Sequence, residues 1–488
     1  MKFRKVFLLS SFSATLIACG SGDSTDDTPT NPESQKLEIT SYAFDSSLSE
    51  ANDSVSYTGQ TKRHLLINDL TFSIKQLEEN ANQDVINNLN FYFRFDGSAS
   101  DTVNHGYHID SGLSVIPGPS YGDISSGKNL IDKIAGNDKP AHLLGGEFFG
   151  WQQGLDSNPT PEKLVDYFFN QIASLATDGS THQIPITGGD TVDIDTVYLT
   201  NTGQDYSQLV QKFLLGAVAF SQGTADYLKT DFSQGNETPD EEGKAYTTAQ
   251  HKWDEAFGYF GAARNYSAYT DDEIAAKGGR AEFANGYHDT NNDGQIDLRS
   301  EVNIGHASNC AKRDSGSQIA TDLTKQIFDA LLTGRAILNA TNTNLTSEAL
   351  SQLQSAALTA SQVWEKCIAA TVIHYINEVI GDMENFTNDA AYADLSAYKN
   401  HAKHWSEMKG FALSLQFNPD SPFRRDASTL THLKTVLNLM GDAPVLADGS
   451  QQGTAFSGGT NQYRDDLIQA RKIIGEAYAF ASENVNNW

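Results

Sequence analysis

Basic residues are scarce in this 488-residue sequence. It holds 34 lysines and arginines against 62 aspartates and glutamates, which gives a formal net charge of −28. Proteins that bind nucleic acid need basic surface to contact the phosphates, so this composition argues against nucleic acid as a partner. The acidic surplus permits cation binding, and it also favours solubility.

A common hydrolase motif is missing as well, because the sequence contains no His-Glu-x-x-His motif of zinc peptidases. A Gly-x-Ser-x-Gly string occurs at residues 118–122, but in a stretch rich in Gly, Ser, Asp and Pro, where loops are expected rather than the strand and helix that flank a nucleophile turn. These observations favour binding over catalysis, although they leave open whether the protein is an enzyme.

Long apolar runs are absent beyond the N-terminus. There, residues 6–17 form a short apolar segment, preceded by Lys2, Arg4 and Lys5. The segment is too short for a mature transmembrane helix, and its order of charge and apolar run is typical of a signal peptide over residues 1–18.

The signal segment ends in Leu16-Ile17-Ala18-Cys19, which resembles a bacterial lipobox. The resemblance implies cleavage before Cys19 and acylation of its thiol and amine, so the membrane anchor would be lipid alone. Gly20 and Ser21 follow without an aspartate, which favours the outer membrane in a cell with two membranes. Residues 19–36 are rich in Gly, Ser, Thr, Asp and Pro, which predicts a disordered tether.

Cysteine is rare, with three in the chain. If Cys19 is acylated, Cys310 and Cys367 remain. An exported protein meets an oxidising compartment, so a disulfide between these two is predicted. A cysteine-based metal site would need other soft ligands nearby, and the sequence shows none.

The character of the chain changes near residue 205. Residues 37–204 are mixed and loop-rich, with helical spacing at 61–86 and 160–176, an aromatic alternation typical of a strand at 90–95, and a short hairpin expected within 184–200. From residue 206 onward apolar residues recur with a period near 3.6, and few prolines interrupt them. Long helices are expected at 206–228, 246–266, 317–338, 347–379, 391–417 and 463–483.

One short pattern occurs twice in the helical part. Residues 253–259 and 405–411 both read Trp-x-Glu-x-x-Gly-aromatic, and the later segments 329–338 and 465–474 resemble each other. Matches in the same order predict an internal duplication. The alternative is that helices of similar amphipathicity look alike.

The predicted fold class is therefore mainly α. Two helical bundle repeats are expected over residues 205–345 and 346–488, preceded by the mixed, loop-rich region 37–204.

Histidines and carboxylates lie one helical turn apart in both copies of the pattern. His251 shares a helix face with Asp254 and Glu255, and His404 shares one with Glu407. Such a pair is half of a site that suits iron, zinc or copper. The further donors expected near the second copy are His401 and His374.

A structural role for these carboxylates is the competing interpretation. A histidine and a glutamate one turn apart often form only a hydrogen bond. The carboxylates could also pair with the repeated arginines, Glu255 with Arg335 and Glu407 with Arg471.

Residues 402–407 resemble the Gly-x-His-x-x-Glu motif of imelysin-like proteins, with Ala402 in place of the glycine. Residues 249–254 are a looser version that ends in Asp254. Imelysin-like proteins are bacterial surface or periplasmic proteins built from two duplicated helical bundles, and they are linked to iron acquisition. The resemblance implies that fold and that role here.

A second candidate site lies between bundle helices. Residues 289–297 match the first nine positions of an EF-hand-type calcium loop, with Gly294 at the sharp turn. Ser300 stands where the usual bidentate glutamate would be, and Glu301 comes one residue later. We expect a structural calcium ion, and the alternative is a surface turn. The expected oxygen ligands are Asp289, Asn291, Asp293, the Gln295 carbonyl and Asp297.

These features predict a surface-anchored binding lipoprotein that captures or hands over iron, haem or another metal. Two other functions stay open: a scaffold or partner of an outer-membrane transporter without metal in its bundles, and a metal-dependent hydrolase. The expected location is the bacterial cell envelope, with the outer membrane favoured.

Overall fold

The computed structural model describes residues 39–488 except 79–83, 108, 110–111, 140–141, 179–181 and 388, and except the side chains of 98 and 99. The predicted signal peptide, the predicted tether and the lipidation site Cys19 lie outside the described residues. The described part is mainly helical, as the sequence predicts, and residues 39–488 form one compact unit. Among the described helices, none combines the length and the apolar character that crossing a membrane would require.

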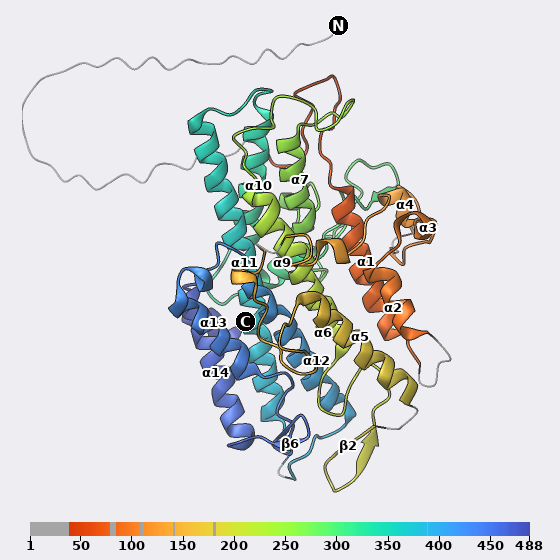
Figure 1. Ribbon diagram of the computed structural model, residues 1–488, viewed down its shortest axis with the longest axis vertical. Coiled ribbons are helices and arrows are strands. Elements are labelled where there is room, and N and C mark those ends of the chain that lie inside the picture. Colours follow the sequence, from red (N-terminus) through yellow and green to blue (C-terminus); the bar gives the residue numbers. More distant parts are fainter. Residues whose placement is uncertain are drawn as a thin grey trace, which may run out of the picture. The chain divides into compact units, whose positions relative to one another are not determined.

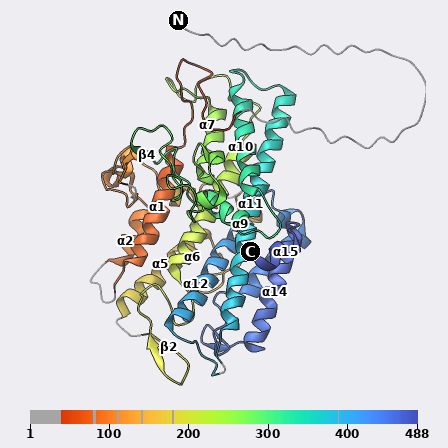
Figure 2. The same cartoon turned by 180° about the vertical axis from the view of Figure 1, so that it is seen from behind.

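The helix α11 (Ser347–Glu384) organises the packing of the helical part. Thr346 caps its start, with a hydroxyl that accepts from the Ala349 amide, and the helix continues for 38 residues. Every residue from 367 to 373 is buried, because other helices surround this stretch on all sides. Figures 1 and 2 show α10 (Leu323–Asn339) beside one half of α11, and α12 (Leu395–Ala412) and α14 (Gly459–Ala477) beside the other.

The expected helix over 206–228 is helical but not uniform. α6 (Tyr206–Leu214) is followed by two wider π-helical turns, Leu215–Phe220 and Gln222–Asp226, and by a 3-10 turn at Tyr227–Lys229. The Thr224 hydroxyl donates to the Phe220 carbonyl at 2.8 Å, so a side chain supports the altered backbone.

The N-terminal region contributes three principal helices, α1 (Thr58–Lys75), α2 (Val85–Phe93) and α5 (Pro161–Asp178). The predicted strand at 90–95 is wrong, because most of that segment belongs to α2. Asp84 caps this helix by accepting from the Asn87 amide, and Val85, Leu89 and Phe93 bury one face at a spacing of four residues. The aromatic alternation concealed that helical period. α1 packs against α2, α6 and α7 (Thr248–Phe260).

Short strands form three two-stranded sheets among the described residues. β2 (Gln183–Pro185) and β3 (Thr191–Asp193) are antiparallel, which confirms the predicted hairpin. β1 (Ser114–Ile116) runs parallel to β4 (Gln295–Asp297) and so joins the N-terminal region to the calcium-type loop. The third sheet pairs β5 (Ser450–Gln451) with β6 (Thr454–Ala455).

Two of the remaining helices, α9 (His306–Ser315) and α15 (Ser482–Asn487), pack on α11. The others are α3 (Gly97–Ser100), α4 (Tyr121–Ile124), α8 (Asp271–Ile274) and α13 (Ala427–Met440). Cys310 of α9 and Cys367 of α11 are fully buried and bonded, which confirms the predicted disulfide.

The two Trp-x-Glu-x-x-Gly-aromatic segments lie on α7 and α12. Trp253 and Trp405 are both fully buried, and each indole N–H donates to a backbone carbonyl. Each motif glycine lies at a close crossing: a Cβ on Gly258 would come 2.6 Å from Tyr57, and one on Gly410 would come 2.7 Å from Lys212. These shared features are consistent with the duplication, which stays a prediction.

Candidate functional site

The helix α7 is bounded by a capping motif at each end. Thr247 and Gln250 form a capping box at its start, and Gly261, at φ = 88°, ends it in the left-handed region. One face of the helix is buried and carries Trp253 and Asp254. The opposite face carries His251, Lys252 and Glu255, which border a cavity.

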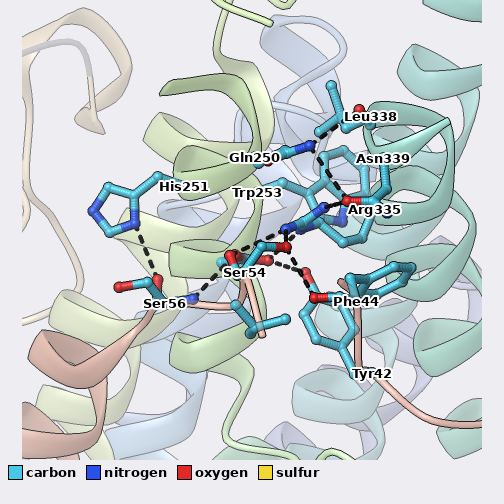
Figure 3. A network of polar contacts seen from close by, with 12 residues as sticks. Tyr42, Phe44, Ser54, Ser56, Gln250, His251, Trp253, Arg335, Leu338 and Asn339 are labelled. Atoms are coloured by element: carbon cyan, nitrogen blue, oxygen red, sulfur yellow. Dashed lines mark hydrogen bonds and ion pairs between the residues drawn. The ribbon is translucent and has the colours of Figure 1, made fainter. Parts of the chain in front are cut away.

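On the buried face, Asp254 and Arg335 of α10 form an ion pair with no exposed side-chain surface. The Arg335 Nε donates to Asp254 at 2.8 Å, as does the Tyr42 hydroxyl at 2.8 Å, and the Ser56 amide donates at 3.1 Å. Burial raises the pKa of the Asp254 carboxyl, while Arg335 and these hydrogen bonds oppose that rise. Figure 3 shows Arg335 beside Ser54, which accepts from its Nη2, and beside Asn339, which accepts from its Nη1.

This pair corrects one sequence prediction. Arg335 was expected to pair with Glu255, but it pairs with the preceding residue, Asp254. Consecutive residues on a helix point about 100° apart, so the face that packs on α10 decides which carboxylate meets the arginine. Glu255 instead accepts from Gln60 Nε2 at 3.1 Å and from Lys252 Nζ at 3.2 Å.

His251 also takes its partner from outside α7. Its Nδ1 lies 3.0 Å from the Ser56 carbonyl, and its ring stacks on Tyr246 with centroids 4.8 Å apart. A carbonyl oxygen only accepts, so Nδ1 carries the proton in this bond. In Figure 3 the His251 ring lies away from Arg335, and its dashed line runs to Ser56.

The cavity beside His251 and Glu255 has a volume of about 390 Å³. Its walls come from the start of α1, from the loop after α4, from the loop before α7 and from α7 itself. They carry five basic side chains and three acidic ones. The residues lining it are Ser56, Thr58, Gly59, Gln60, Arg63, Ser125, Lys128, Lys133, Tyr227, Asp240, Glu241, Lys244, Tyr246, His251, Lys252 and Glu255.

Sequence reasoning missed the α1 side of this cavity. Arg63 and Lys128 lie in the region where the sequence shows no functional motif. Their spacing carries no signal, because a helix and a loop 65 residues apart meet only in the folded chain. A local excess of lysine at 128–139 in an acidic chain was the one available hint.

In the second copy, the expected pair of Glu407 with Arg471 is wrong. Glu407 lies 3.3 Å from Lys212 Nζ of α6 and 4.0 Å from Lys403 Nζ. Arg471 donates instead to the Asn377 side chain at 2.6 Å. The crossing of α6 over α12 brings Lys212 to Glu407.

The histidines of the second copy diverge. His404 Nδ1 lies 2.8 Å from Asp382 and 3.9 Å from Glu378, both on α11. His401 is fully buried and bonds to the Tyr392 hydroxyl at 2.9 Å. Burial lowers the pKa of His401 to about 4.

His374 lies on α11 against the Tyr375 ring, and burial lowers its pKa to about 3. Its site therefore favours neutral imidazole. Within the described ranges, no group of three or more His, Cys, Asp or Glu side chains is arranged to hold a metal ion. Since Glu407 turns to Lys212 and His404 to Asp382, these two residues do not fit one metal site as they stand.

The calcium-type loop forms a tight turn. Asp289 accepts from the Gly294 amide at 2.8 Å, Asn291 from the Asp293 amide at 2.9 Å, and Asp293 from the Gln295 amide at 2.8 Å. Gly294 has φ = 81°, which confirms the glycine turn expected there.

Glu301 closes this loop from one position beyond the usual glutamate. It is 5% exposed and accepts from the Thr290 and Asp297 amides, each at 2.8 Å. Burial raises the pKa of Glu301, and the nearby carboxylates of Asp289 and Asp297 add to the rise. Asp297 itself holds Arg299 through both carboxylate oxygens, at 2.9 and 2.8 Å, so its oxygens already have a cation.

Comparison with known proteins finds one family. A model of the family described as "Domain of unknown function (DUF4856)" matches residues 158–444. The match spans more than half of the chain, from the loop before α5 to just after α13, and includes α7, α12 and the calcium-type loop. No curated protein and no solved structure matched. The chain belongs to the DUF4856 family.

Proposed function

We propose that this protein is a surface-anchored binding lipoprotein that takes part in the acquisition of iron, haem or another metal. The observation that supports binding is the cavity at α1 and α7, because about 390 Å³ lies in the range of small-molecule sites. Its walls are charged and rich in hydrogen-bonding groups. The imelysin-like motif at residues 402–407 supports the link to metal acquisition.

The residues place a limit on how a metal would be held. His404 and Glu407 are committed to different partners, so direct coordination by this pair is not part of the proposal. His251 and Glu255 share the cavity wall, where they would contact a bound solute. The metal is therefore proposed to arrive with its own ligands, as haem or as a chelate.

Equilibrium dialysis of the purified mature protein tests the proposal. The probes are ferric iron, ferrous iron, zinc, ferric citrate and haem, with bound metal measured by mass spectrometry. Saturable binding of at least one probe, weakened by substitutions in the cavity, is expected. Binding of none would overturn the proposal and favour the scaffold of an outer-membrane transporter. Turnover in a hydrolase substrate panel would instead favour the enzyme.

We also propose that the loop 289–297 holds a structural calcium ion, with Glu301 as an additional oxygen donor. The support is the turn around Gly294, which gathers Asp289, Asn291 and Asp293. Calcium should raise the melting temperature of the parent, and the double variant Asp289→Asn, Asp293→Asn should lose that increase. Asp190→Asn, an exposed turn carboxylate elsewhere, is the matched control and should keep it. The same calcium response in parent and double variant would refute the ion.

The membrane anchor is proposed to be lipid on Cys19, with the outer membrane as its location. The support is the order of positive charge, apolar run and Leu-x-x-Cys in the first 19 residues. Mass spectrometry of membrane-extracted protein should find an acylated N-terminal cysteine. A Cys19→Ala protein that still partitions fully with membranes would contradict the proposal.

A further inference from the structure

The cavity carries positive charge in a protein whose formal net charge is −28. Two of its five basic side chains are balanced inside it: Lys252 by Glu255 at 3.2 Å and Lys244 by Glu241 at 3.9 Å. Lys133 is balanced outside it by Asp138 at 3.0 Å. The other two basic residues, Arg63 and Lys128, have no carboxylate partner in the described part of the chain.

Arg63 and Lys128 converge at the first turn of α1. An ideal Cβ on Gly59 would lie 3.3 Å from Lys128 Cε and 3.4 Å from Arg63 Nη1. The Arg63 guanidinium is largely buried and donates to the carbonyls of Asn129 at 2.7 Å and Gly59 at 3.3 Å, and none of the ion pairs in the described part of the chain includes it. Its charge is therefore held beside the cavity without a counterion.

The start of α1 adds to this positive potential. Tyr57 stands at its N-cap and makes no side-chain capping bond, and its first turn contains no acidic residue. The Thr58 and Gly59 amides find no acceptor among the described residues, although both residues line the cavity. Free amides and the positive end of an 18-residue helix favour anions.

We propose that this cavity binds a small molecule carrying at least two anionic oxygen groups, carboxylate or phosphate. One group lies against Lys128 and the first turn of α1, and the rest extends toward Lys244 and His251. The inference rests on the proposed binding function, whose ligand it specifies. A bare metal cation is repelled by the unpaired charges of Arg63 and Lys128, so a metal enters as the complex of an anionic chelator.

Isothermal titration of the mature protein at low salt tests this. Citrate and inorganic pyrophosphate are the probes, and their relative affinities distinguish carboxylate from phosphate. Binding of at least one is expected, and it should weaken as salt screens the charges. Lys128→Gln should weaken it by about tenfold or more, the scale of one hydrogen bond between charged groups.

Lys325→Gln is the matched control. Lys325 is exposed, pairs with Asp329 on its own helix and does not line the cavity, so its removal should leave the affinity unchanged. Lys128 is itself exposed, so its variant is expected to fold, and a parental circular dichroism spectrum checks this.

The outcomes separate the two proposals. If neither probe binds at millimolar concentration, or if Lys128→Gln binds as the parent does, the anion inference is overturned. Haem or ferric citrate binding in that case would leave the proposed metal function standing. If citrate or pyrophosphate binds through Lys128 but no metal species does, the anion inference holds and metal acquisition fails.

Discussion

The Asp254–Arg335 pair makes the most demanding prediction, because removing one partner leaves a buried charge alone. In Arg335→Met, Asp254 keeps the Tyr42 hydroxyl and the Ser56 amide but loses the one cation that pairs with it among the described residues. Both side chains are fully buried, so water cannot replace the lost partner without a local opening. Breaking a buried pair in this way costs about 3–5 kcal/mol. The cost should lie at the upper end, since Arg335 also bonds Ser54 and Asn339.

The assay is a double-mutant cycle by urea denaturation, with Arg335→Met, Asp254→Asn and the double variant. The double variant removes both charges, so it should lose less stability than the two single variants lose in sum, by about 1–3 kcal/mol. The denaturant slope should stay constant, which shows that the folded state is otherwise intact.

Lys212→Met provides a comparison in the second copy. Its partner Glu407 lies 3.3 Å away, and both side chains retain some exposure, 14% and 6%. The coupling of Lys212 and Glu407 should therefore be smaller than that of Arg335 and Asp254. Additivity of the Asp254 and Arg335 variants within about 0.5 kcal/mol would refute the reasoning.

Three further predictions concern single features of the core. Burial raises the pKa of Glu365 to about 7, so between its ordinary pKa of 4.5 and 7 the folded state holds a proton that the unfolded chain has released. The free energy of unfolding must then fall as pH rises through this window, by up to about 3 kcal/mol. Urea titrations at several pH values should show that Glu365→Gln abolishes this part of the fall. An identical pH profile in parent and variant would contradict the assignment. A Cβ on Gly334 would overlap the buried Trp253 indole, so Gly334→Ala should destabilise the fold by about 1–3 kcal/mol in chemical denaturation. Gly381→Ala is the control and should be neutral or stabilising, because nothing lies within 4 Å of its Cβ. Equal effects of the two substitutions would show that α7 and α10 do not pack tightly at Gly334. Replacing Cys310 and Cys367 by alanine opens a loop of 57 residues and should lower the free energy of unfolding by about 4 kcal/mol in the chain-entropy model. Reduction of the disulfide in the parent protein should have a similar effect. An unchanged denaturation midpoint would argue against this stabilisation by the disulfide.

Local sequence determined the helices in segments where the apolar residues recur with one dominant period. The long helices α7, α10, α11, α12 and α14 follow from apolar spacing near 3.6, and their ends follow from caps such as the Thr247 box. The β2–β3 hairpin and the disulfide were also predictable, the first from turn-rich sequence and the second from the small number of cysteines. α2 was not, because its aromatics alternate while its buried residues recur every fourth position.

Only the tertiary structure decided the electrostatic partners. Asp254 and Glu255 are adjacent in sequence, yet one is buried against Arg335 and the other faces the cavity, because α10 covers one side of α7. Glu407 likewise meets Lys212, from a helix that begins 201 residues earlier in the chain, and not the arginine of its own half. The cavity assembles Arg63, Lys128 and His251 from three separate segments. Helical periodicity specifies which face of a helix is apolar, but the neighbouring helix that covers that face determines which charges lie buried together and which remain open to a ligand.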